Sequence, residues 1–173
     1  KEFESVIELI GNILKDFSVL QDLKLVLITN GSLIHRPAEQ DGMEEMAEFN
    51  GEVWLKVDRT LRAERQRNNS SPISLKKIRH HLQIVTSLCP TWLQTCLFQI
   101  NGEPPGELET EAYLKFIQSL KDEGLPLKGV LLYGIARPSL QPEAYQLTPV
   151  SESWLTAHGK KIKALGLAVK VNP

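Results

Sequence analysis

The stretch Glu52-Val53-Trp54-Leu55-Lys56-Val57-Asp58 has the apolar composition of a buried β-strand, yet it carries two opposite charges near its end. Side chains of a strand alternate between its two faces, so Trp54, Lys56 and Asp58 point to one face and the aliphatic residues between them to the other. An unpaired charge buried in a sheet costs several kcal/mol, so these charges need a polar cavity or a partner. The pattern favours a ligand site at the end of the strand. Its alternative is a Lys56–Asp58 ion pair that only completes a core.

Around this strand, helical and strand patterns alternate along the chain, which is typical of βα units and a mainly parallel sheet. Two helices are predicted over 3–17 and 38–49. Two more begin at caps provided by Ser74 and Ser151, and a fifth ends near Gly124. Prolines and polar residues mark a long loop over 137–149. The predicted strands are 24–29, 52–58, 92–99, 129–133 and 167–171.

Four to five βα units correspond to about half to two thirds of a TIM-type barrel, which normally takes about 250 residues. With 173 residues, this barrel cannot close. The sequence therefore predicts an α/β fold, namely a partial TIM-type βα barrel with mainly parallel strands that forms a single domain over 1–173.

Composition excludes several classes of function. The 20 basic and 21 acidic side chains nearly balance, which argues against a nucleic-acid or membrane footprint, and the local basic run over 59–67 is interpreted as a solvated loop. No apolar segment approaches the roughly 20 residues that span a bilayer. Cys89 and Cys96 match neither a disulfide framework nor a metal-binding spacing, which indicates a reducing, cytoplasmic location.

The chain opens inside a helical pattern. Apolar residues recur at helical spacing from Phe3 onward, with no initiator Met and no capping residue before them. We therefore expect a fragment of a longer protein, whose missing N-terminal part is a partner of this chain.

Polar side chains gather where the predicted strands end. Ligands of parallel α/β sheets bind at the carboxyl ends of the strands, so the repetition of polar residues at four successive ends predicts a binding rim. Its candidate residues are Thr29, Asn30, Lys56, Asp58, Gln99, Asn101, Tyr133 and Arg137.

Four short motifs occur in order along the chain: Ile28-Thr29-Asn30-Gly31-Ser32-Leu33, Trp54-Leu55-Lys56-Val57-Asp58, Asn68-Asn69-Ser70-Ser71-Pro72 and Leu132-Tyr133-Gly134-Ile135-Ala136-Arg137-Pro138-Ser139. With these motifs the sequence resembles the later part of a radical S-adenosylmethionine (radical SAM) enzyme. The family's Cys-x-x-x-Cys-x-x-Cys loop and its Gly-Gly-Glu segment do not occur in these residues. The resemblance therefore implies the C-terminal portion of such a barrel, without its cluster-binding part.

The resemblance also implies cofactors and roles. The full-length protein would hold S-adenosylmethionine on a [4Fe-4S] cluster and generate a 5'-deoxyadenosyl radical, whereas we expect neither cofactor to bind this fragment. Lys56 suits the cofactor's carboxylate, Asp58 its ribose hydroxyls, and Thr29, with Asn30 beside it, a further polar contact. Four other residues would border the adenine or an unknown substrate: Gln99, Asn101, Tyr133 and Arg137.

Two other functions stay open at this point. The chain could be a non-catalytic α/β scaffold or binding domain, with its open sheet edge available for self-association. It could also belong to a metal-independent barrel enzyme in which Lys56 forms a Schiff base with a carbonyl substrate. A three-cysteine loop in the upstream coding sequence would support the radical SAM function, and its absence would favour the scaffold.

Overall fold

The computed structural model describes residues 2–19, 22–58, 60, 73–135, 137, 140 and 142–173. Most of the basic run 59–67 and the motif at 68–72 therefore lie outside the described residues, as do parts of the motif at 132–139. In the described part, no helix is both long enough and apolar enough to cross a membrane.

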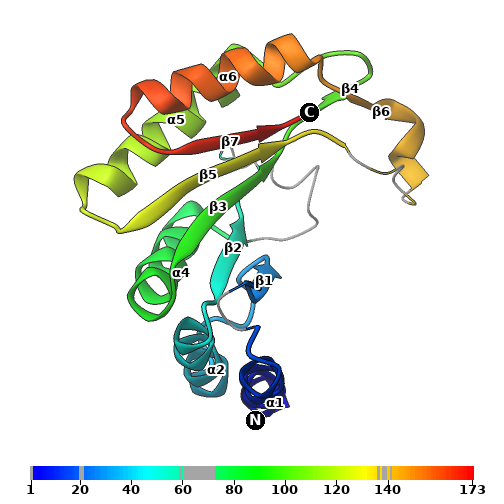
Figure 1. The fold of residues 1–173 in the computed structure, drawn as a ribbon. Coiled ribbons are helices and arrows are strands. Elements are labelled where there is room, and N and C mark those ends of the chain that lie inside the picture. The colour runs from blue at the N-terminus through cyan, green and yellow to red at the C-terminus, as the bar shows by residue number, and fades with distance from the viewer. Residues whose placement is uncertain are drawn as a thin grey trace.

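Five parallel strands form the main sheet, in the order β1-β2-β3-β5-β7. The strands therefore follow one another in chain order, with β1 at one edge, and the predicted partial barrel is confirmed (Figure 1). Their bounds are β1 Val26–Thr29, β2 Glu52–Lys56, β3 Thr91–Cys96, β5 Leu127–Tyr133 and β7 Val169–Asn172.

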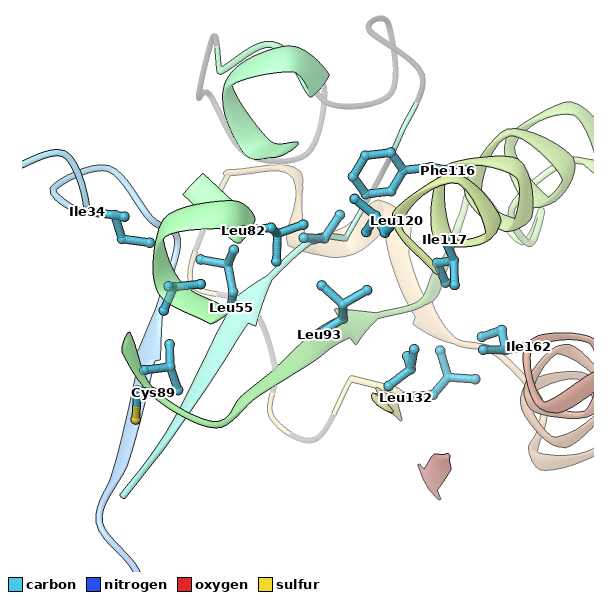
Figure 2. Close-up of a cluster of buried hydrophobic side chains, with 14 of the residues drawn as sticks. Ile34, Leu55, Leu82, Cys89, Leu93, Phe116, Ile117, Leu120, Leu132 and Ile162 are labelled. Carbon is cyan, nitrogen blue, oxygen red and sulfur yellow. The ribbon is translucent and has the colours of Figure 1, made fainter. Parts of the chain in front are cut away.

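Helices cover one face of this sheet, and α1 packs beside α2 (Figure 1). The side chains of Leu55, Leu93 and Leu132 point from the sheet into this layer and are at most 2% exposed. Figure 2 shows the resulting core, in which they meet Leu82 of α4 and Ile117 of α5. The helices are α1 Glu2–Asp16, α2 Pro37–Glu48, α4 Leu75–Leu88, α5 Glu107–Asp122 and α6 Glu152–Ala164.

Both predicted serine caps are confirmed. The hydroxyl of Ser74 accepts a hydrogen bond from the amide of Lys77 at 3.2 Å, and that of Ser151 accepts one from the amide of Trp154 at 3.2 Å. Each cap satisfies an amide that has no partner within the first turn of its helix.

The strand predicted over 92–99 is wrong at its end. β3 stops at Cys96, and β4 (Phe98–Ile100) instead pairs antiparallel with β6 (Leu147–Pro149), in the segment predicted as a loop. The 3₁₀ helix η1 (Pro142–Gln146) precedes β6. The apolar run continues through both strands, so periodicity alone could not show where the chain leaves the main sheet.

Candidate functional site

The face of the main sheet opposite the helices forms the candidate site. We call this surface the inner face and define it by residues that the strand register aligns on one side: Ile28, Trp54, Lys56, Trp92, Gln94, Cys96, Leu131, Tyr133, Lys170 and Asn172. Parallel sheets are normally covered on both faces. Here Ile28 is 54% exposed, while Trp54 and Leu131 are half-buried. The prediction that Trp54 and Lys56 point to the same face is confirmed, whereas Asp58, predicted on that face too, lies beyond the end of β2.

Lys56 and Asp58 lie at the carboxyl end of β2. The Asp58 side chain is only 5% exposed, and its Oδ1 accepts a hydrogen bond from the amide of Cys96 on the next strand at 2.9 Å. Its Oδ2 lies 3.9 Å from Nζ of Lys56, whose side chain is 38% exposed. At 3.9 Å this contact is longer than a hydrogen bond, so the Lys56 ammonium group is not bound directly to the carboxylate. The carboxylate is thus fixed by the backbone, and the ammonium group can reach another partner.

Tyr133 is aligned with Cys96 across the β3–β5 pair and is half-buried. Burial raises the pKa of the Tyr133 phenol above its ordinary value, and the neighbouring Cys96 and Asp58 raise it further. The phenol therefore stays protonated at neutral pH and can donate a hydrogen bond at this end of the inner face.

The other candidate residues serve local turns or lie elsewhere. The Thr29 hydroxyl accepts from the amide of Gly31 at 3.1 Å, and Thr29 is aligned with Leu55, which faces the helices. Asn30 is exposed and accepts from the amide of Ser32 at 3.0 Å. These are ordinary polar turns at a strand end.

Gln99 lies in β4, which pairs with β6 in a second sheet, and Asn101 directly follows β4. The Gln99 side chain accepts from the Thr148 hydroxyl at 2.9 Å, and the Asn101 amide donates to the carbonyl of Gln146 at 2.8 Å. Arg137 is exposed. Of the eight predicted rim residues, the main sheet therefore aligns Lys56 and Tyr133 on its inner face, with Asp58 bonded to the strand between them.

The two cysteines do not fit a cluster site. Cys89 precedes β3 and Cys96 ends it, so they lie at opposite ends of one strand. Burial raises the pKa of the Cys89 thiol to about 11, with a further contribution from Glu52. The described part of the chain contains no group of three or more metal-ligating side chains. These residues by themselves do not fit a [4Fe-4S] cluster, which needs three or four thiolate ligands.

A cleft of about 580 Å³ lies between α5 and α6, and His158 and Trp154 line it. Their rings stack, with centroids 5.4 Å apart and planes at 9°. Burial, together with the nearby Lys161, lowers the pKa of His158 to about 4, so the imidazole is neutral at pH 7. This ring packs in the helical layer and takes no part in the inner face.

The residues of the inner face that sequence reasoning missed include Trp92, Gln94 and Lys170. The sequence did contain a signal for Gln94: it is a polar residue inside an apolar strand, two residues after Trp92 and so on the same face. Lys170 gave none, since a lysine in a terminal strand is usually solvent-exposed.

No protein-family model matches the sequence, and the comparison with curated proteins gives no significant match. Among solved structures, the chain is similar to a domain of pyruvate-formate lyase-activating enzyme from Bacteroides vulgatus, with a TM-score of 0.59 and 16% identity, covering 100% of this chain and 95% of that one. At this identity the likeness establishes the fold, a partial α/β barrel. An intracellular xylanase from Thermoanaerobacterium saccharolyticum aligns over 90% of this chain and 74% of its own with a TM-score of 0.39 and 10% identity, which is too distant to inform the fold.

Proposed function

We propose that this chain is the C-terminal portion of a radical SAM partial barrel, folded as a single domain over 1–173. Its inner face would contribute the ribose and methionine side of the S-adenosylmethionine pocket and part of the substrate pocket. The observation that carries this proposal is that Lys56, Asp58 and Tyr133 lie at the same end of an open sheet face, where β2 and β5 end, with Cys96 of the intervening strand β3 bonded to Asp58 and aligned with Tyr133. The fold shared with a domain of an activating enzyme supports it.

When bound in the complete protein, the [4Fe-4S] cluster and S-adenosylmethionine supply a 5'-deoxyadenosyl radical. The residues of this chain would bind and orient S-adenosylmethionine and the substrate. Lys56 pairs with the carboxylate of the methionine part, Asp58 accepts a hydrogen bond from a ribose hydroxyl, and Tyr133 donates one toward the adenine or the substrate. Because its backbone bond already orders the Asp58 carboxylate, little conformational entropy is lost on binding. The cluster ligands come from the N-terminal part of the same protein.

A binding experiment on the full-length, cluster-loaded protein tests this proposal. Lys56→Ala should weaken S-adenosylmethionine binding about ten-fold to a hundred-fold, because a charge-assisted hydrogen bond contributes roughly 1.5 to 3 kcal/mol. Asp58→Asn, which keeps an acceptor for the Cys96 amide, should also weaken binding. Iron content and unfolding temperature should stay near wild type, and Lys160→Ala, an exposed lysine of α6, should bind normally.

One result of this experiment would contradict the proposed cofactor pocket. If Lys56→Ala and Asp58→Asn bind the cofactor normally but unfold at a lower temperature, the two residues are a structural ion pair and the proposed pocket is wrong.

A non-catalytic binding domain is the second candidate. It is favoured by the apolar surface formed by the outer face of α1 and the residue that follows it: Leu9 of α1 and Phe17 directly after it are 61% and 75% exposed, as expected of a surface that binds another polypeptide. The upstream coding sequence decides between the two, since only the radical SAM function requires a three-cysteine loop there.

A further inference from the structure

The middle of the inner face holds a row of four aligned side chains. The register pairs Lys56 with Gln94, Gln94 with Leu131, and Leu131 with Lys170. Neighbouring strands lie about 4.8 Å apart, so the backbones of Lys56 and Lys170 are roughly 14 Å apart across the row. Two long cationic side chains therefore flank one buried amide.

Gln94 is poorly satisfied in this row. It is 9% exposed, and its Oε1 is buried without a hydrogen-bond partner in the described part of the chain. Trp92, two residues earlier on the same face of β3, is 6% exposed. Its indole Nε1 also lacks a hydrogen-bond partner among the described residues. Folded proteins leave few buried polar groups unpaired, and each needs an explanation. Strand alternation directs both side chains toward the inner face, where a ligand can bond them.

The charge near these two side chains is positive. Nζ of Lys170 lies 4.7 Å from the centroid of the Trp92 ring, and Nζ of Lys128 lies 5.8 Å from it. Lys128 is already paired with Glu52, whereas the described residues place no carboxylate within ion-pair distance of Lys170. Lys170 is also exposed, so an incoming ligand can reach it. The donors here are the Lys170 ammonium and the Trp92 N–H. The unpaired Gln94 Oε1 is an acceptor, and rotation of this amide by 180° would place its NH₂ group, a donor, in the same position.

We propose that Lys170, Gln94 and Trp92 bind the anionic group, a carboxylate or a phosphate, of a ligand that lies on the inner face. The half-buried Trp54 and Leu131 provide apolar contact for the rest of that ligand. In the proposed enzyme this ligand is the substrate rather than the cofactor, an assignment that rests on the proposed function. Anion binding itself requires neither cluster nor cofactor.

Titration of the full-length protein with small flat probes tests the site. Benzoate and phenyl phosphate distinguish a carboxylate from a phosphate, benzamide is the neutral control, and calorimetry with tryptophan fluorescence gives the affinities. We expect one anion to bind at least ten-fold more tightly than benzamide. Lys170→Met should remove most of this preference, while Lys160→Met on α6 should keep it. Equal binding of all three probes, or an equal loss in both lysine variants, would overturn the proposal.

Gln94→Met separates a ligand-binding role from a structural one. Removing an unsatisfied buried amide should raise the unfolding temperature while weakening anion binding about ten-fold. A lower unfolding temperature with unchanged binding would show that Gln94 only supports the fold, against the proposal.

Measuring S-adenosylmethionine binding by Lys170→Met separates the two proposals. Normal cofactor binding with lost anion binding assigns the anion to the substrate, whereas loss of both would make it the cofactor's carboxylate and refute the substrate assignment. If the wild-type protein binds the anion but no cofactor, the anion site stands and the radical SAM function fails.

Discussion

Glu52, the first residue of β2, accepts hydrogen bonds from three side chains. Its Oε1 accepts from Nζ of Lys24 at 2.7 Å and also from Nζ of Lys128, and its Oε2 lies 3.4 Å from the indole nitrogen of Trp54. Burial alone would raise the pKa of this carboxyl, but the bonds from Lys128, Lys24 and Trp54 outweigh it and hold the pKa at about 2, against an ordinary value of 4.5. The charged form is therefore favoured by folding.

The lowered pKa of Glu52 predicts that the folded protein loses stability in acid. Because the pKa is lower in the folded than in the unfolded protein, the stabilisation is complete above about pH 4.5 and is lost as the pH falls toward about 2. Glu52→Gln should cost about 1 to 3 kcal/mol at pH 7, allowing for solvent screening of the partly exposed lysines. Urea unfolding of both proteins at several pH values should show the difference shrinking between pH 5 and 2. A constant difference would mean that Glu52 acts through packing rather than charge.

At the scale of the element, Gly129 sets how β5 fits between its neighbours. Its φ is 147°, and it is aligned with Trp92 next to an irregularity in the β3–β5 register. A Cβ here would collide with the Ala168 carbonyl before β7 and come within 2.8 Å of the Trp92 ring. Only glycine lets the indole lie over β5, because it lacks the Cβ that would fill this space.

Gly129→Ala should therefore destabilise the fold by more than 2 kcal/mol, roughly the combined cost of a strained backbone and an overpacked contact. It should also shift the emission of Trp92. Thermal unfolding with fluorescence measures both. Gly106→Ala is the matched control, since a Cβ at Gly106 meets no atom within 4 Å and its φ is −64°. Similar losses in both variants would contradict the packing argument.

At the scale of the whole molecule, the chain leaves apolar surface uncovered along α1. Val6, Leu9 and Ile13 on its outer side, and Phe17 directly after it, recur at helical spacing and are 46% to 75% exposed. Val26 and Ile28 of the edge strand β1 are also exposed. Contiguous apolar patches mark interfaces, so if the chain is the C-terminal portion proposed above, the other part of that protein would cover this surface.

Without that cover, the 173-residue chain should self-associate. Sedimentation over a range of concentrations should show association, and Leu9→Lys should weaken it at least ten-fold by placing a charge in the interface. Leu108→Lys, at a position 76% exposed on α5, is the control and should leave association unchanged. A chain that stays monomeric, or equal effects of the two substitutions, would argue against an interface on α1.

Local patterns predicted much of this fold. Alternating and helical periodicities placed the strands and helices, and polar residues before helices placed the caps at Ser74 and Ser151. Alternation along one strand also sufficed to put Lys56 on the inner face, because side-chain direction in a strand follows from the backbone alone. The alternation of helical and strand patterns also predicted a mainly parallel sheet, which the structure confirms.

The rest required contacts between distant segments. Glu52 meets lysines 28 and 76 residues away, and the amide of Cys96 fixes Asp58 from 38 residues away. Gln99 was assigned to the rim by its place after an apolar run, yet pairing with Thr148 draws it into a second sheet. Periodicity encodes which face a side chain takes, because that depends on neighbouring residues. Strand partners, register and unsatisfied groups such as Gln94 depend on packing across the sheet, and only the tertiary structure decided them.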